Sequence, residues 1–321
     1  MKVILMAAAL FAVPVLHAQT QWQLATGYGV NTFHTRNLVQ FANDVDQATQ
    51  GGLRIAVHPN NTLVKLAEIP KAVESGKVQA GEAIMTSFVG EVPIAGADAV
   101  PFVVRTYADA RRMWQLQRPL IDAHFKAIGL KALYAVAWPP QGLFSIAPVR
   151  SKSDFQGTRM RTYNPTTVRI AELLGTQPVD VPMVGVHRAL SANRLDSMIT
   201  SALTGVENEV WGKIKYYYDI NAWFPKNIVF VNQKAFDALT PAMQQALVTA
   251  AADAEKRGWA MSQAAAEASV TELQHNGIQV ERVPPDFDAD LKRLGERFSR
   301  EWVNSVGYEA TKIFIPYYFE R

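Results

Sequence analysis

The chain has 321 residues, a formal net charge of +3 at pH 7 and no cysteine. Without cysteine there are no disulfides, no thiol nucleophile and no cysteine-ligated metal site. Basic and acidic residues are mixed along the chain without a basic run, so the charge pattern predicts no nucleic-acid partner. A chain of this length favours two domains over one.

The N-terminus has the pattern of a secretory signal peptide. Lys2 precedes an apolar run over residues 3–16, and His17-Ala18-Gln19 follows it. A transmembrane anchor is the competing interpretation, but the run is shorter than the roughly 20 helical residues that span a bilayer. We therefore predict a signal peptide over residues 1–18 and an exported, periplasmic protein.

The first half of the chain alternates strand-like apolar runs with amphipathic helices, which predicts an α/β fold. Its predicted strands are 22–26, 53–57, 78–85 and 130–138, and its predicted helices are 32–49, 65–75 and 107–128. The last strand ends at Pro139-Pro140-Gln141-Gly142. This sequence stops a helix or a sheet ladder and suits a crossover between domains.

The second half continues the alternation. Its predicted strands are 143–147, 159–162, 178–181 and 197–199, its predicted helices are 166–174 and 186–194, and a strand at 227–231 returns to the first unit. Two long helices are predicted over 241–276 and 286–306. We predict one lobe from residues 19–138 plus 228–276 and a second from 139–227 plus 277–321. Several crossings between two lobes imply a cleft that closes by a hinge.

Known catalytic signatures are absent from the sequence. No two of the six histidines have metal-ligand spacing, and no Gly-x-Ser-x-Gly elbow occurs. Gly27-Tyr28-Gly29 begins like a dinucleotide-binding loop, but Thr32 occupies the third glycine position. We expect no metal and no cofactor. An exported α/β enzyme acting on an organic acid stays an alternative, because catalytic groups are often far apart in sequence.

Arg161 is the main candidate for ligand binding. It lies near the end of the predicted strand 159–162, just before Asn164-Pro165, which reads as a helix cap followed by the first helical residue. The N–H groups and dipole of a helix N-terminus favour an anion, and arginine binds a carboxylate with two parallel hydrogen bonds. The spacing alone is equally compatible with an arginine on the surface of a strand.

Further candidates lie where predicted strands meet helices, the usual place for pockets in α/β folds. We expect hydrogen bonds to a ligand from Gln141, Tyr163, Asn31, Thr200 and Ser201, and apolar walls from Phe88, Met183 and Trp211. The remaining candidates are Asn164, Phe33, His34, Glu68, Ser87, Trp138 and Asn227. Each of these residues is also compatible with a purely structural role.

An ordered set of segments resembles the DctP-type substrate-binding proteins of tripartite ATP-independent periplasmic (TRAP) transporters. The set extends over the whole mature chain and comprises Phe33-His34, residues 66–73, Val100-Pro101-Phe102, residues 155–161, Leu195-Asp196, residues 221–227 and the long helix that follows. The resemblance implies two α/β lobes, joined by strands and braced by a long helix, that close over one organic acid. It also implies delivery to a membrane permease, and an arginine at the position of Arg161 that pairs with the ligand carboxylate.

Two departures from this family pattern bear on the ligand. Some sialic-acid-type members carry a second arginine near the position of Gln141, so a second ionic contact is not expected here. Those members also carry Gln-Glu-Asn where this chain continues from Ser197 to Thr200-Ser201, which places hydroxyls where an amide would be. We therefore expect a hydroxy, keto or aromatic monocarboxylate rather than sialic acid, bound by a monomer.

Overall fold

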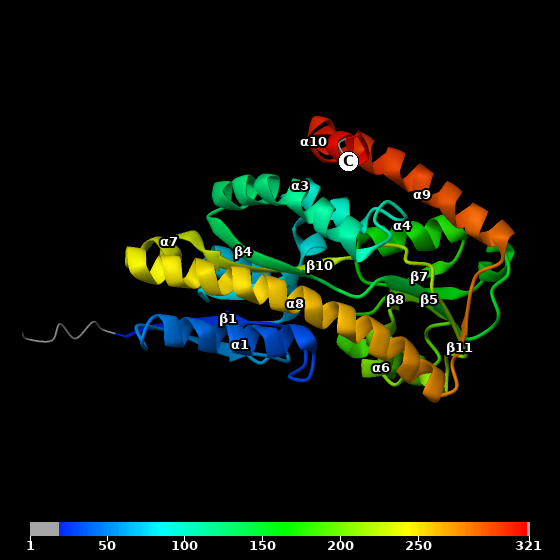
Figure 1. Ribbon diagram of the computed structural model, residues 1–321. Helices are drawn as coiled ribbons and strands as arrows, with labels where there is room; N and C mark the ends of the chain where they lie inside the picture. Colours follow the sequence, from blue (N-terminus) through cyan, green and yellow to red (C-terminus); the bar gives the residue numbers. More distant parts are fainter. Residues whose placement is uncertain (1–18, 320–321) are drawn as a thin grey trace, which may run out of the picture.

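The protein folds into two α/β lobes, each built on one mixed sheet (Figure 1). The computed structural model describes residues 19–319, so the predicted signal peptide lies outside the described residues. Within this range the first sheet has the strand order β2-β1-β3-β10-β4, and the second has the order β11-β9-β5-β8-β6-β7. The predicted two-lobed α/β fold is confirmed.

The first sheet is mostly built from the N-terminal half of the chain. Its strands are β1 (Thr20–Ala25), β2 (Leu53–His58), β3 (Ala80–Ile84), β4 (Leu130–Ala137) and β10 (Lys226–Asn232). Its helices are α1 (Phe33–Ala48), α2 (Ile69–Glu74), α3 (Tyr107–Ala127) and α7 (Gln233–Asp237). Strand β10 pairs antiparallel with both β3 and β4, so the predicted return of the chain to the first unit is confirmed.

The second sheet takes most of its strands from the middle of the chain. They are β5 (Gln141–Ser145), β6 (Arg159–Thr162), β7 (Gln177–Asp180), β8 (Ser197–Ser201), β9 (Tyr216–Tyr218) and β11 (Gln279–Glu281). Its helices are α4 (Pro165–Leu174), α5 (Val186–Ser191) and α6 (Ala202–Glu207). Strand β6 runs parallel to β7 and β8, so their carboxyl ends lie at one edge of the sheet.

The ends of several helices follow directly from the sequence. The Thr32 hydroxyl accepts a hydrogen bond from the Thr35 N–H and caps α1. Thr240 caps α8 (Pro241–His275), which begins with a proline. The predicted helix over 65–75 is instead a 3₁₀ turn followed by α2, because Pro70 cannot donate a hydrogen bond and sits in the first turn of α2.

Two extended crossings between the lobes are hydrogen-bonded to each other. Residues 138–140 lead from β4 to β5, and residues 219–225 lead from β9 to β10. The N–H groups of Trp138 and Gln141 donate to the carbonyls of Pro225 and Trp223, at 2.8 and 3.0 Å. Helix α8 is the third connection; it contacts α1 and β4 in the first lobe and α6 and β11 in the second (Figure 1).

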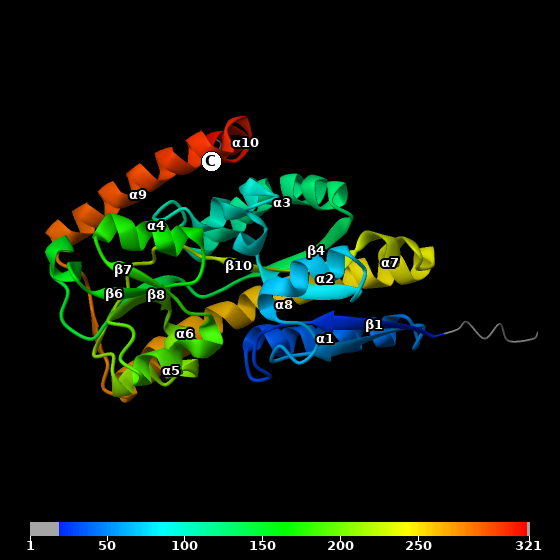
Figure 2. The same ribbon diagram turned by 180° about the vertical axis from the view of Figure 1, so that it is seen from behind.

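The C-terminal helices contact both lobes. Helix α9 (Pro285–Val306) packs Phe287 and Leu291 into the core of the second lobe. Helix α10 (Tyr308–Phe319) packs Ile313 into the core of the first, beside α3 (Figure 2). The predicted division of the chain assigned all of residues 277–321 to the second lobe; that division stays a prediction, and α10 lies on the first lobe.

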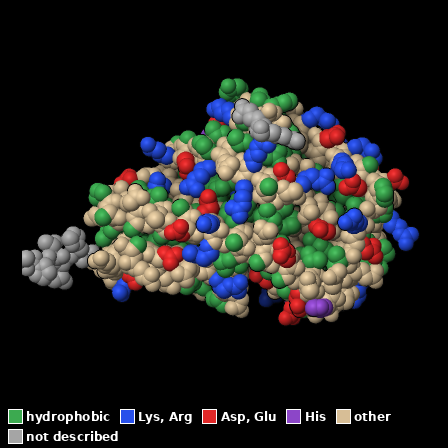
Figure 3. All heavy atoms as spheres, viewed as in Figure 1, with side chains coloured by type: hydrophobic (Ala, Val, Ile, Leu, Met, Phe, Trp, Pro, Cys, Tyr) green, Lys and Arg blue, Asp and Glu red, His purple; other side chains and the backbone are tan. Residues whose placement is uncertain are grey.

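The surface carries no large block of one charge on the face seen in Figure 3, where basic and acidic side chains are interspersed. Across residues 19–319, no helix combines the length and the apolar character needed to cross a membrane.

A fully buried ion pair lies at the start of β10, directly after the crossing formed by residues 219–225. The Lys226 ammonium is 3.1 Å from the Asp98 carboxylate, and both side chains are at most 1% exposed. The Lys226 N–H also donates to the same carboxylate, at 2.9 Å. Burial raises the pKa of Asp98 and lowers that of Lys226, while their mutual attraction opposes both shifts. Each of the two charges is therefore stable in the interior only while its partner is present.

We predict that Asp98→Asn lowers the free energy of unfolding by about 3 kcal/mol or more, because it leaves the Lys226 ammonium buried without a counter-charge. Urea unfolding followed by circular dichroism would measure the change. Glu91→Gln is the matched control, since it removes a carboxylate from the exposed ion pair with Lys71 and should have a far smaller effect. Equal stabilities of the two variants would contradict the prediction.

Candidate ligand-binding site

A cavity of about 340 Å³ lies between the two lobes, a size typical of small-molecule sites. Both crossings contribute to its wall. The lining residues are Tyr28, Leu66, Ala67, Ile84, Ser87, Trp138, Gln141, Arg161, Tyr163, Asp180, Pro182, Met183, Thr200, Ser201, Thr204 and Pro225.

Arg161 lies in this cavity with its charge unpaired. Its side chain leaves β6 and is only 3% exposed. The Nε–H donates to the Val181 carbonyl at 2.9 Å, and the guanidinium carbon lies 4.6 Å from the centre of the Tyr163 ring. One terminal nitrogen, Nη1, has no hydrogen-bond partner, and no carboxylate in residues 19–319 is within ion-pair distance.

Burial lowers the pKa of the Arg161 guanidinium to about 10, so the group stays positively charged at neutral pH. A buried cation without a counter-ion is costly in a protein interior. The arrangement therefore favours an anion that binds beside the guanidinium.

The polar groups next to Arg161 are held in place by one another. The Tyr163 hydroxyl donates to Gln141 Oε1 at 3.1 Å, and Gln141 Nε2 donates to the Pro139 carbonyl at 2.9 Å. Burial raises the pKa of Tyr163 to about 12, so its hydroxyl is neutral at physiological pH. Thr200 and Ser201 lie at the end of the neighbouring strand β8. Apart from Arg161 and Asp180, the polar lining is uncharged.

The helix that follows Arg161 begins as the sequence predicts. Asn164 caps α4, because its Oδ1 accepts the Thr167 N–H at 2.9 Å, and Pro165 is the first helical residue. The Asn164 Nδ2 reaches across the cleft and donates to the Thr86 hydroxyl of the first lobe at 3.3 Å. Asn164 thus joins the two lobes and does not itself line the cavity.

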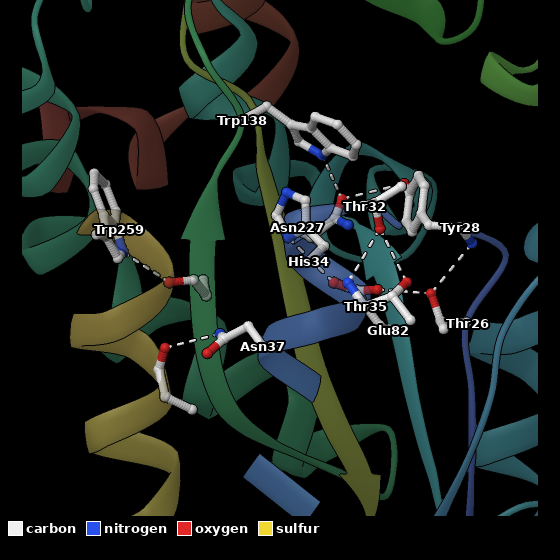
Figure 4. A network of polar contacts seen from close by, with 12 residues as sticks. Thr26, Tyr28, Thr32, His34, Thr35, Asn37, Glu82, Trp138, Asn227 and Trp259 are labelled. Atoms are coloured by element: carbon white, nitrogen blue, oxygen red, sulfur yellow. Dashed lines mark hydrogen bonds and ion pairs between the residues drawn. The ribbon is translucent and has the colours of Figure 1, made fainter. Parts of the chain in front are cut away.

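Tyr28 and Trp138 form an aromatic wall of the cavity on the side of the first lobe, and Asn227 supports both side chains (Figure 4). Its Oδ1 accepts hydrogen bonds from Trp138 Nε1 at 2.8 Å and from the Tyr28 hydroxyl at 3.2 Å. Because both rings line the cavity, a single buried amide fixes the position of two ligand-facing side chains.

A second group of buried polar residues lies behind the same wall. Glu82 accepts a hydrogen bond from the Thr26 hydroxyl at 2.7 Å and lies 3.3 Å from Nδ1 of His34 (Figure 4). The His34 ring contacts both Phe33 and Trp138, with ring centres 4.1 and 4.3 Å apart. Thr26, His34 and Glu82 support the wall from behind and do not line the cavity.

The structure brings together only part of the candidate set. The candidates that line the cavity are Ser87, Trp138, Gln141, Arg161, Tyr163, Met183, Thr200 and Ser201. Phe33, His34, Asn164 and Asn227 lie one layer behind it.

The other four candidates lie away from the cavity. Asn31 and Glu68 are exposed to solvent. Phe88, expected as an apolar wall, is buried in the core of the first lobe against Phe125 and Phe230. Trp211, expected in the same role, packs against the core of the second lobe. Large aromatic side chains are most often buried in hydrophobic cores, which explains why neither Phe88 nor Trp211 lines the cavity as predicted.

Several residues that line the cavity are not among the candidates predicted from the sequence. They are Tyr28, Leu66, Ala67, Ile84, Asp180, Pro182, Thr204 and Pro225. A usable signal existed for two of them, since Tyr28 follows β1 closely and Asp180 is the last residue of β7. The carboxyl ends of strands are where α/β sheets bind ligands.

A second cavity, of about 380 Å³, lies under α9 and lacks a free charge. Its two charged residues bind each other, because Arg169 Nε and Nη2 contact the two carboxylate oxygens of Glu301 at 2.8 Å each. In the described part of the chain, no three His, Cys, Asp or Glu side chains could hold a metal ion together. The cavity around Arg161 is therefore the candidate site.

Two lobes joined by crossings, with a buried cation in the cleft, define a solute-binding protein. A family model described as bacterial extracellular solute-binding protein, family 7 (DctP), matches residues 25–304. The chain belongs to this family, whose members are receptors and not enzymes.

Solved structures and relatives agree with this assignment. The chain is 38% identical to DctP6, a Bordetella pertussis extracytoplasmic solute receptor binding pyroglutamic acid, with a TM-score of 0.90 over 93% of this chain and 99% of that one. It is 33% identical to a marine metagenome TRAP solute-binding protein specific for pyroglutamate, with a TM-score of 0.91 over 94% and 99%. It is 25% identical to the 2,3-diketo-L-gulonate-binding periplasmic protein YiaO of Escherichia coli, over 77% of this chain and 76% of YiaO.

We predict that Asn227→Ala lowers the free energy of unfolding by about 2 kcal/mol or more, because it leaves the Trp138 N–H and the Tyr28 O–H unpaired in the interior. Urea unfolding monitored by tryptophan fluorescence would measure the change. Tyr28→Phe removes one of the two donors while Trp138 keeps its bond, so it should cost less. A larger loss for Tyr28→Phe than for Asn227→Ala would refute this account of the wall.

Proposed function

We propose that this solute-binding protein captures a small organic acid with one carboxylate in the cavity around Arg161 and delivers it to the membrane permease of a TRAP transporter. The observation that carries the proposal is the guanidinium of Arg161, which lines the cavity, is buried, stays charged at neutral pH and has no carboxylate partner among the described residues. A ligand carboxylate would supply the missing counter-charge through charge-assisted hydrogen bonds.

The rest of the lining supports one carboxylate and not two. Arg161 is the one Lys or Arg among the lining residues, and Gln141 donates its amide to the backbone. A second carboxylate would therefore face neutral groups or the negative charge of Asp180. Apolar surface comes from Leu66, Ile84 and Met183, which suits a compact ligand with a hydrocarbon part.

Pyroglutamate is the first ligand to test. It is the ligand named for two solved structures that are 38% and 33% identical to this chain. It carries one carboxylate on a small ring, so it matches both the single free cation and the cavity size. The sugar acid named for YiaO is a weaker guide, because that relative is only 25% identical.

Capture would proceed by closure of the lobes around the ligand. The cavity wall combines residues of both lobes, such as Trp138 and Ser87 on one side and Arg161 on the other. A ligand that contacts both walls binds the closed form more tightly and so shifts the equilibrium toward it. The predicted signal peptide would export the chain, which would act in the periplasm as a monomer.

We predict that Arg161→Ala weakens pyroglutamate binding about a hundredfold or more, since losing a desolvated charged hydrogen bond costs about 3 kcal/mol. Isothermal titration calorimetry would measure the affinity. Arg159→Ala is the matched control, because it removes an arginine from the same strand whose partner is Asp196, outside the cavity. Unchanged affinity in Arg161→Ala would rule out the proposed carboxylate site.

A thermal melt against a panel of organic acids would test the ligand class. The protein would first be unfolded and refolded, so that carried-over ligand is removed. A ligand at a thousand times its dissociation constant adds about 4 kcal/mol of stability, so cyclic monocarboxylates should raise the melting temperature by several degrees. A rise with dicarboxylates alone would show that the predicted single-carboxylate class is wrong.

A further inference from the structure

Asp180 is the one acidic residue that lines the cavity, and the fold makes no evident use of it. It is the last residue of β7 and lies opposite Thr162 in the parallel ladder. Its carboxylate forms no hydrogen bond or ion pair with another residue between 19 and 319. The residue is exposed to solvent, yet it lines the same small cavity as the unpaired cation of Arg161.

The positions of Asp180 and Arg161 are fixed relative to each other by their strands. The Val181 N–H donates to the Thr162 carbonyl at 3.0 Å, which continues the ladder beyond Asp180. The Val181 carbonyl in turn accepts the Arg161 Nε–H. The two charges are close enough for Asp180 to oppose the effect of burial on the pKa of Arg161, yet they do not form an ion pair. Both residues line the cavity, so a ligand in it can lie beside both charges.

These two charges make opposite demands on a ligand. The guanidinium only donates hydrogen bonds, and an ionised carboxylate only accepts them. A ligand that places its carboxylate at Arg161 must therefore present a hydrogen-bond donor to Asp180, because a second acceptor there would be repelled.

A ligand N–H suits this position better than a ligand hydroxyl does. A hydroxyl can donate or accept, so the neutral hydroxyls of Tyr163, Thr200 and Ser201 could satisfy it equally well. An amide N–H can only donate, and among the lining side chains Asp180 is the one carboxylate, which no other described residue binds.

We propose that Asp180 is a specificity-determining residue that accepts a hydrogen bond from a ring N–H beside the ligand's carboxylate. It selects cyclic amide acids over analogues in which an oxygen replaces the N–H, and it excludes dicarboxylates. This inference rests on the proposed function, since it assumes that the ligand carboxylate lies at Arg161.

The test compares pyroglutamate with 5-oxotetrahydrofuran-2-carboxylate, in which a ring oxygen replaces the N–H. The wild type should bind pyroglutamate about tenfold or more tightly than the lactone in calorimetric titrations. Asp180→Ala should reduce this ratio to near one by weakening pyroglutamate, with lactone affinity retained or improved. Retained lactone binding also shows that the variant is folded.

Two further variants sharpen the comparison. Asp180→Asn keeps an oxygen acceptor, so it should preserve part of the preference that Asp180→Ala loses. Asp253→Asn removes an exposed carboxylate from α8, which does not line the cavity, and should leave the ratio at the wild-type value.

The possible failures can be told apart. If the wild type binds both acids equally, or if Asp180→Ala keeps the full preference for pyroglutamate, the Asp180 proposal is overturned and the carboxylate site at Arg161 stands. If the wild type binds neither acid, pyroglutamate is the wrong ligand and the Asp180 proposal falls with it.

Discussion

Burial shields the guanidinium of Arg161 from bulk water, and few interactions with the protein compensate for the lost hydration. Its partners are one backbone carbonyl and the face of the Tyr163 ring, neither of which carries a full negative charge. Desolvating an ion costs several kcal/mol, and only an anion in good geometry offsets that cost. Without a ligand the buried guanidinium lacks a counter-charge, and a ligand carboxylate would supply it.

The cavity accepts a narrow range of ligands, because hydrogen bonds from the residues behind its walls fix the lining side chains. Asn227 holds Tyr28 and Trp138, and Gln141 is held by the Pro139 carbonyl while it accepts from Tyr163. Side chains that are already ordered lose little entropy when a ligand arrives. Little of the binding free energy is then used to order the site, so a ligand whose shape and polar groups match the fixed side chains binds tightly.

The parts of the molecule that sequence predicted are those encoded by neighbouring residues. The strand Arg159–Thr162, the cap at Asn164 and the helix starting at Pro165 lie within one short segment, so propensity and capping rules describe them. Asn227 and Tyr28 are 199 positions apart, and Asp98 and Lys226 are 128 apart. No local pattern reveals such pairs. Strands β9 and β11 have three residues each, too few to show an alternation.

Helix α8 connects the two lobes along one side and so limits how the cleft can open. Its 35 residues make a rod of roughly 50 Å that is packed against both lobes, and none of its residues lines the cavity. A continuous helix resists bending, so we expect the lobes to separate least along the side that it covers. We therefore expect the cleft to widen away from α8, through a single opening. Solute would then enter and leave through the same opening, and a permease would have to approach that opening to receive it.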